Sequence, residues 1–330
     1  MKLGILISDF EKQKPHFTSF FIAREAVKQG YQVYIFQYCD LQLNSSGELA
    51  CRMATVNDTK ATDKKYFEAL LSSYATGKSI QLSSLSCFWI RTDWIELIGL
   101  GHRLGPQLVI QFAQVLESKG VRVIPSVKGL ATGDSKLYLE QFHQSIRPRA
   151  IVTLNHDAIR DFSKEVGGTV VLKPAIGDQG KNVFLYNLKE PQNANQIFEV
   201  LASQGFIYAQ EYVPDTQYKS TRLFLFNGLP LLYQGKYACL MLCSVNGDFR
   251  SNAANGGTPV IATLSPQMLT AAESIAPKLK QDGFFLSALD FVADKVVEVN
   301  QMNVGGMRSA QRFHEVNFTQ HIIKTLANNP

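Results

Sequence analysis

The sequence contains 330 residues, of which 45% are hydrophobic and 18% charged, so it can form a large core and lacks the composition of a disordered chain. Its 33 Lys and Arg against 28 Asp and Glu leave a net charge of +5, and no basic run is longer than two residues, so nucleic-acid binding is disfavoured. No apolar stretch approaches the ~18 residues of a membrane span, so membrane binding is disfavoured as well. The five cysteines show neither a disulfide nor a zinc-site spacing, and we expect a reduced, cytoplasmic protein of about two or three domains.

The first 125 residues alternate between apolar runs and amphipathic segments. Four runs predict buried strands, at residues 3–7, 31–36, 87–90 and 121–124. Helices are expected over residues 20–27 and 107–119. Because a strand–helix–strand order brings parallel strands together, the pattern predicts a doubly wound parallel sheet in a domain that ends at Pro125.

The middle of the chain combines short helices with a strand–loop–strand segment. Helices are expected over residues 135–142 and 156–167, with a strand at 151–154 between them. Two further strands, 169–174 and 183–186, flank a loop that contains glycines. Because a strand follows this loop, the segment is predicted to be a hairpin, which differs from the strand–loop–helix order of a P-loop.

The last third of the chain is rich in predicted strands. Asn227-Gly228 lies between apolar runs at 222–226 and 231–233, which is a strong hairpin signal. A helix over residues 267–280 precedes a further hairpin and a helix at 318–326. We therefore predict an antiparallel sheet in this part of the chain.

That last hairpin, residues 288–300, carries two acids and an asparagine at matching positions. If its turn is centred on Asp294, Asp290 lies directly opposite Glu298, and Asn300 shares the face of Glu298. Four apolar residues would then point the other way, into a core: Leu289, Phe291, Val297 and Val299. Opposed carboxylates require a cation, and carboxylate and amide oxygens suit Mg²⁺ shared with phosphate, so the pattern fits a metal site as well as a solvated surface hairpin.

Lys173 ends an apolar strand next to the glycine-containing loop. An ammonium group beside exposed backbone N–H groups is typical of phosphate binding, and Gly177 and Gly180 would let the loop close over a polyphosphate. A hairpin turn with a lysine that extends to solvent is the alternative.

Arg250 lies in a polar loop with Asn252, Gly256 and Gly257. An arginine held there could bind a carboxylate or a developing oxyanion, while an ordinary surface loop explains the same residues.

Taken in order, these segments resemble the ATP-grasp family, and within it the bacterial glutathione synthetases, over nearly the whole chain. The resemblance rests on short motifs at residues 1–6, 90–93, 135–136, 171–180, 209–214, 222, 250–257 and 290–300. It implies an α/β ATP-grasp fold with three domains: a substrate-binding parallel-sheet domain at 1–125, a central lid domain at 126–213 and a catalytic antiparallel-sheet domain at 214–330.

The resemblance also implies roles for individual residues. The nucleotide phosphates would be bound by Lys136, Lys173, Gly177, Gln179 and Gly180. Glu211 and the backbone of Val213 would hold the adenine, and Asp290, Glu298 and Asn300 would hold Mg²⁺, with Mn²⁺ as the alternative. Arg222 and Arg250 would be catalytic, and the remaining substrate contacts would come from Arg91, Asn252, Gly256 and Gly257.

The implied reaction is a ligation in which a carboxylate takes the γ-phosphoryl group of ATP and an amine then displaces phosphate. Glutathione synthesis from γ-glutamylcysteine and glycine is the leading expectation, with small amino acids or dipeptides as substrates and a homo-oligomer as the assembly. A related ligase with another acceptor is the first alternative, since residues 301–307 differ from the family loop. An inactive nucleotide-binding regulator is the second, since Ser220 replaces an acid that the family carries.

Overall fold

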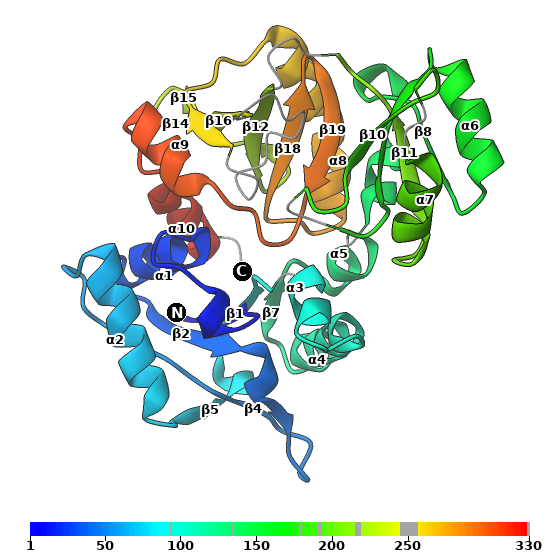
Figure 1. The fold of residues 1–330 in the computed structure, drawn as a ribbon. Helices are drawn as coiled ribbons and strands as arrows, with labels where there is room; N and C mark the ends of the chain where they lie inside the picture. Colours follow the sequence, from blue (N-terminus) through cyan, green and yellow to red (C-terminus); the bar gives the residue numbers. More distant parts are fainter. Residues whose placement is uncertain are drawn as a thin grey trace.

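The computed structural model describes residues 1–92, 94–133, 135–177, 180–190, 193–214, 219–244 and 257–328. Three larger sheets follow one another along the chain, and helices cover them (Figure 1). No helix in these ranges is long and apolar enough to cross a membrane.

The N-terminal sheet has the order β2-β1-β6-β7, and all of its pairings are parallel, as the sequence predicts. Its strands are β1 (Lys2–Ile7), β2 (Gln32–Gln37), β6 (Cys87–Ile90) and β7 (Arg122–Ile124). The helix α1 (Thr18–Lys28) covers one face and α4 (Gly105–Ser118) the other, because their buried residues belong to two different core clusters. The sheet is therefore doubly wound.

Several N-terminal elements have too weak a pattern to be predicted. They are α2 (Asp63–Ala75), α3 (Trp94–Gly99), α5 (Val127–Thr132) and a small antiparallel sheet of β3 (Leu41–Leu43), β4 (Leu49–Arg52) and β5 (Ser79–Gln81). Short 3-10 helices lie at Phe10–Lys12, Tyr38–Asp40 and Leu82–Ser84.

The central sheet is antiparallel, in the order β10-β9-β11-β8. Its strands are β8 (Ala150–Thr153), β9 (Thr169–Pro174), β10 (Phe184–Asn187) and β11 (Ile207–Glu211). The helices α6 (His156–Glu165) and α7 (Ala194–Ala202) share a separate core cluster with one face of this sheet. The other face carries Lys173 and Gln210.

Two 3-10 helices, Lys136–Gln141 and Gln144–Ile146, precede the central sheet. The sequence predicts a helix over 135–142, but the N–H of Phe142 donates to the carbonyl of Leu139, three residues back, which is 3-10 geometry. Tyr138 and Leu139 are buried in the core cluster of the C-terminal sheet, so tertiary packing determines the winding of this segment.

The C-terminal sheet has the order β17-β16-β12-β18-β19. Its strands are β12 (Lys219–Phe226), β16 (Cys239–Cys243), β17 (Thr258–Val260), β18 (Leu286–Val292) and β19 (Lys295–Asn300), and α8 (Pro266–Gln281) packs on it. The predicted Asn227-Gly228 turn is present, with positive φ at both residues, but the strand that follows is β13 (Leu229–Pro230). The predicted pairing of 222–226 with 231–233 holds at Leu231, whose N–H donates to the Phe224 carbonyl at 2.9 Å. It is wrong for the next two residues, because β14 (Leu232–Tyr233) pairs with β15 (Lys236–Tyr237).

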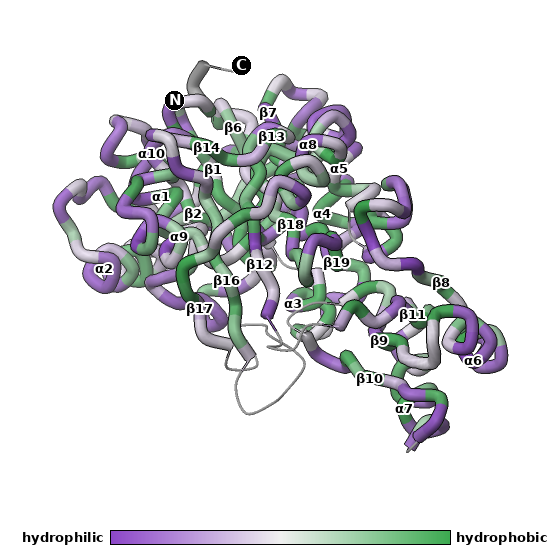
Figure 2. The backbone as a smooth tube through the Cα atoms, turned by 90° about the horizontal axis from the view of Figure 1, so that it is seen from above, coloured by the Kyte–Doolittle hydropathy of each residue, from purple (hydrophilic) through white to green (hydrophobic). Residues whose placement is uncertain are grey.

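The N-terminal and C-terminal sheets share one hydrophobic core. The last helices, α9 (Met307–His314) and α10 (Phe318–Asn328), contribute to it together with α1, and α10 lies beside α1 (Figure 1). The central sheet and its helices form a core cluster of their own and lie to one side of the molecule in Figure 2. The interior strands are mostly hydrophobic, while the outer helices are largely hydrophilic (Figure 2).

Candidate functional site

The acidic hairpin is formed by β18 and β19, and it pairs Asp290 with Glu298 as predicted. The turn and the strand pairing that produce this register differ from the predicted ones. The turn is Ala293-Asp294, so Val292 pairs with Lys295, and an irregularity in β19 then restores the Asp290–Glu298 pair. As a result Val296 enters the core, and the prediction that Val297 points into the core is wrong.

Asp290 is 6% exposed and is neutralised by an arginine on the neighbouring strand. Arg222 donates from Nε to Oδ1 at 2.7 Å and from Nη2 to Oδ2 at 2.6 Å, and this bidentate pair of hydrogen bonds fixes the orientation of the carboxylate. Burial alone would lower the pKa of Arg222, but the Asp290 carboxylate outweighs burial and raises it. Asn300 adds a third bond from Nδ2 to Oδ2 at 3.0 Å. One carboxylate of the hairpin is thus held rigidly in place.

Lys173 on β9 is only 7% exposed. Its ammonium group donates to Gln210 Oε1 at 3.0 Å and to the Val297 carbonyl at 3.4 Å, and it lies 5.2 Å from the centre of the Tyr208 ring. Burial lowers the pKa of Lys173 to about 8, while the charge of Glu298 opposes that shift. This lysine is therefore a buried cation held by neutral groups.

Lys136 approaches the same hairpin from the 3-10 helix before the central sheet. Its backbone N–H donates to the Ala175 carbonyl at 2.9 Å, and its ammonium donates to the Gly177 carbonyl. The ammonium also lies 3.7 Å from Glu298 Oε1. The structure therefore brings together Lys136, Lys173, Glu298 and the start of the glycine-containing loop, in which Gly180 has a left-handed backbone with φ of 67°.

The oxygen ligands expected for a divalent metal lie on one hairpin. Because the Asn300 amide nitrogen donates to Asp290, its oxygen remains as the atom that could bind a metal. Among the described residues, no group of three or more His, Cys, Asp and Glu is placed to hold a metal ion. A hard cation here would complete its shell with phosphate oxygens and water, which is the usual arrangement for Mg²⁺.

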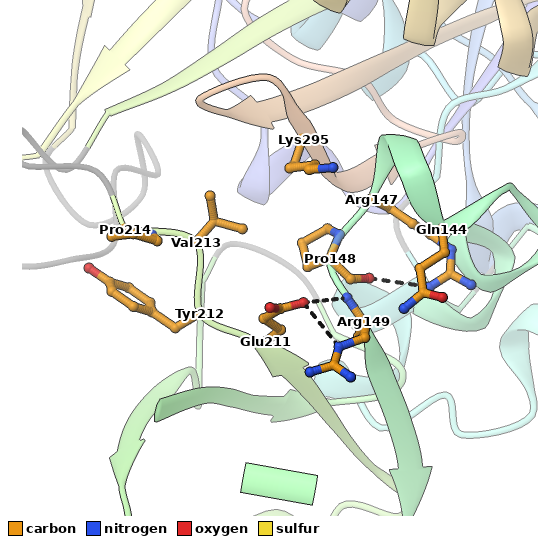
Figure 3. A pocket seen from close by; sticks show the side chains of 9 residues that line it. All are labelled: Gln144, Arg147, Pro148, Arg149, Glu211, Tyr212, Val213, Pro214 and Lys295. Carbon is orange, nitrogen blue, oxygen red and sulfur yellow. Dashed lines mark hydrogen bonds and ion pairs between the residues drawn. The ribbon is translucent and has the colours of Figure 1, made fainter. Parts of the chain in front are cut away.

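Glu211 and Val213 lie on the segment that joins the central and C-terminal sheets, beside a pocket of about 370 Å³. Figure 3 shows its lining: Gln144, Arg147, Pro148, Arg149, Glu211, Tyr212, Val213, Pro214 and Lys295. The Glu211 carboxylate accepts from the Arg149 N–H at 3.1 Å and lies 3.6 Å from Arg149 Nε. Since neighbours on a strand alternate, Glu211 occupies the face of β11 opposite to Gln210 and Lys173.

The other predicted residues lie elsewhere. Arg91 directly follows β6 and is fully buried, and Gly257 is buried just before β17. Four predicted residues, Gln179, Arg250, Asn252 and Gly256, lie outside the described residues.

Two residues of the site were missed by sequence reasoning. Gln210 and Tyr208 both contact the Lys173 ammonium, because β11 pairs with β9 in the register Tyr208–Lys173 and Gln210–Val171. Alternation along β11 would place these two residues on one face. Their position beside Lys173 depends on the pairing of β11 with β9, two strands that β10 and α7 separate along the chain.

Comparisons with known proteins agree with this architecture. The family model for the prokaryotic glutathione synthetase ATP-grasp domain matches residues 135–315, and the model for the N-terminal domain of prokaryotic glutathione synthetase matches residues 1–94. The glutathione synthetase of Vibrio parahaemolyticus serotype O3:K6 is 28% identical to this chain, and the match covers 99% of this chain and 98% of the relative. The glutathione synthetase of Nostoc sp. (strain PCC 7120) is 29% identical, and the match covers 100% of this chain and 98% of the relative.

Solved structures give the same fold. The ATP-grasp ligase PsnB complexed with a minimal precursor matches with a TM-score of 0.62 at 16% identity, over 98% of this chain and 97% of the other. The D-cycloserine synthetase DcsG matches with a TM-score of 0.62 at 15% identity, over 99% of both chains. The predicted α/β ATP-grasp fold is confirmed.

Proposed function

The chain belongs to the prokaryotic glutathione synthetase family of ATP-grasp ligases, and from this membership we propose that it joins γ-glutamylcysteine to glycine with ATP, releasing ADP and phosphate. The observation that carries the proposal is the meeting of two lysines from the central part of the chain with the acidic hairpin, where Lys136 lies 3.7 Å from Glu298 and Lys173 contacts the Val297 carbonyl. Phosphoryl transfer needs this combination of cations and carboxylates, because it depends on positioning and charge neutralisation.

Lys136 and Lys173 are proposed to bind the phosphates of ATP. The Lys173 ammonium is held by an amide oxygen and a carbonyl, and phosphate oxygens would replace these dipoles with full negative charge. The loop with Gly177, Gln179 and Gly180 would then cover the phosphates and exclude water from the reacting carbonyl.

Asp290, Glu298 and Asn300 are proposed to hold the divalent metal that this family uses with ATP. We propose Mg²⁺, with Mn²⁺ as the alternative, because the donor set consists of oxygen atoms and offers only two protein carboxylates, so that phosphate and water would complete the shell. When bound, the metal would neutralise charge on the phosphates. The resemblance implies a catalytic role for Arg222. Because all three of its nitrogens donate hydrogen bonds to protein oxygens, two on Asp290 and one on Gly305, we propose that it acts by keeping Asp290 oriented.

In the proposed reaction a substrate carboxylate oxygen attacks the γ-phosphorus and ADP leaves. The amine of the acceptor then attacks the acyl carbon, loses a proton and expels inorganic phosphate, which leaves an amide. Arg250, with Asn252, Gly256 and Gly257, is proposed to steady the acceptor and the developing oxyanion, as the family resemblance implies.

The adenine is proposed to contact the backbone of Val213. Glu211 is less suited to that role because its carboxylate is already paired with Arg149 on the other face of β11.

We also propose domain limits of 1–125, 126–213 and 214–330, a homo-oligomeric assembly and a cytoplasmic location. Small amino acids and peptides are the expected partners, and nucleic acid is not.

A panel of donor and acceptor substrates tests the function. Phosphate release would be measured with γ-glutamylcysteine plus glycine and with other dipeptide and amino-acid pairs, each with Mg-ATP and each repeated with the Glu298→Gln variant as the blank. Turnover that requires γ-glutamylcysteine and glycine supports the proposal. Turnover with a different pair alone would reassign the acceptor, and Mg-ATP binding without ADP formation for any pair would indicate a regulatory nucleotide-binding protein.

A further inference from the structure

Arg91 is a buried cation without an acidic partner among the residues that the structure describes. It follows β6, at the carboxyl end of the parallel sheet, and its side chain is 1% exposed. Burial is the sole cause of its altered pKa, which falls to about 9. One of its nitrogens, Nη1, is buried without a hydrogen-bond partner in the described part of the chain. Burying a charged group without an acidic partner is energetically unfavourable, so the position of Arg91 requires a functional explanation.

Arg91 makes hydrogen bonds to α1 and to the loop that follows β19. Its Nη2 donates to the Val304 carbonyl at 2.8 Å and its Nε donates to Ser19 Oγ at 3.0 Å. The next carbonyl, that of Gly305, accepts from Arg222 Nη1 at 3.3 Å. Two consecutive peptide groups are thus held by two arginines, the buried Arg91 beside the N-terminal sheet and the partly buried Arg222 of the C-terminal sheet.

This loop, residues 301–306, begins directly after Asn300 and ends at α9. Met302 packs against the core cluster of the N-terminal sheet, and Val304 is buried in the core that the two sheets share. Gly306 has φ of 97°, and a Cβ there would lie 2.9 Å from Leu240 Cδ2. The loop is therefore confined by packing on both sides.

The same arginine that holds Gly305 also fixes Asp290 through its other two nitrogens. A continuous set of contacts runs from Arg91 through Val304 and Gly305 to Arg222 and Asp290. It joins the N-terminal sheet to the acidic hairpin.

We propose that Arg91 is a positioning residue, which fixes loop 301–306 from the N-terminal sheet so that Arg222 and Asn300 hold Asp290 in its working orientation. The inference rests on the proposed ligase function and adds a role for Arg91 that differs from direct substrate contact. The two nitrogens on one edge of its guanidinium are already bonded to protein atoms, and the side chain has almost no exposed surface.

The test compares the full-length wild type with Arg91→Met and Arg91→Lys. We expect Arg91→Met to lower kcat at least about tenfold, with the KM for ATP within about twofold of the wild type, because Lys136 and Lys173 lie outside the N-terminal sheet, on a 3-10 helix and on β9. Arg91→Lys should keep part of the activity, since an ammonium can still donate to the Val304 carbonyl.

Arg122 provides a matched control. It lies on β7 of the same sheet, donates from Nη1 to the Leu326 carbonyl of α10 at 3.2 Å and lies over the Phe285 ring, so it also joins the two sheets but does not contact the loop in these bonds. We expect Arg122→Met to leave kcat within about twofold. A kcat loss in Arg122→Met equal to that in Arg91→Met would overturn the proposal, because the effect would then belong to sheet packing in general.

Amide hydrogen exchange gives a readout that does not depend on turnover. In Arg91→Lys, and more weakly in Ser19→Ala, we expect faster exchange over residues 301–307 with unchanged exchange in the central sheet. Unchanged exchange in that loop, or a large rise in KM for one substrate at constant kcat, would refute positioning and favour direct substrate contact. If the wild type turns over none of the panel substrates, the proposed function fails, while exchange in the loop still decides the role of Arg91.

Discussion

The buried position of Lys173 predicts a pH-dependent affinity for ATP. Because burial lowers its pKa to about 8, the ammonium is about nine-tenths protonated at pH 7 and about one-tenth protonated at pH 9. If only the charged form binds phosphate, the Kd for the nucleotide should rise about twofold by pH 8 and about tenfold by pH 9, relative to its low-pH value. Tenfold corresponds to about 1.4 kcal/mol of binding free energy.

Calorimetric titration of Mg-ATP between pH 6.5 and 9.5 measures this effect. Phosphate stabilises the ammonium, so binding near pH 8 should take up about half a proton, which is detected by comparing buffers of different ionisation enthalpy. The Lys173→Met variant is the control, because the titration of the nucleotide itself is common to both proteins. If the wild type and Lys173→Met show parallel pH curves, the cationic role of Lys173 is refuted.

Stability should respond to pH in the opposite direction. The folded-state pKa of Lys173 is depressed from 10.5 to about 8, so between these values the unfolded chain holds a proton that the folded chain lacks. The free energy of unfolding should therefore rise with pH in this window, by about 3 kcal/mol in total relative to Lys173→Met. Urea unfolding of both proteins at pH 7 and pH 10 checks the sign.

Other substitutions probe the site and the fold. Glu298→Gln should leave the melting temperature nearly unchanged and reduce Mg-dependent turnover at least about 100-fold, and retained turnover would remove Glu298 from the metal site. Asp282 accepts hydrogen bonds from Tyr138 and Lys278, each at 2.9 Å, and pairs with Lys128 at 2.8 Å, so Asp282→Ala should lower the free energy of unfolding by about 2–3 kcal/mol. Burial opposes ionisation of Asp282, but its bonds with Lys128, Lys278 and Tyr138 outweigh burial and lower its pKa. The destabilisation by Asp282→Ala should therefore be fully present at pH 7 and shrink at acidic pH in urea titrations, and equal destabilisation at both pH values would contradict the assignment. Gly283 has φ of 77° and a Cβ there would overlap Ser126 Oγ, so Gly283→Ala should cost about 2–4 kcal/mol, while Gly47→Ala, with φ of 75° and open space around it, should cost about 1 kcal/mol by the same assay.

The register of the acidic hairpin shows how far sequence reasoning extends and where it stops. The pairing of Asp290 with Glu298 follows from counting residues about a turn, and the structure has it. Counting residues assumes regular pairing along the whole hairpin. The irregularity in β19 places Val296, and not Val297, in the core. A bulge depends on the fit of two strands to their neighbours, which a single strand's sequence does not contain.

Contacts between residues far apart in the chain also could not be predicted from the sequence. The parallel order of the first sheet follows from local strand and helix patterns, and it is correct. The hydrogen bonds from Lys173 to Gln210 Oε1 and from Arg91 to the Val304 carbonyl join segments far apart in the chain. The residue types that form these bonds are common in proteins, so their contacts become evident only in the folded structure. In the same way the segment at 135–142 takes 3-10 geometry because its buried residues pack on a distant sheet.

The shared core of the first and last sheets affects how the chain can fold during synthesis. α1 packs against α10 in the core that the two sheets share, and Tyr31 donates to the Ile323 carbonyl, so the apolar surface that α10 covers beside α1 stays exposed until the final helix has left the ribosome. The central sheet, whose core is its own, can close as soon as β11 has emerged. A chain that stops before residue 318 should therefore expose an aggregation-prone surface at its N-terminal end while its middle is already folded.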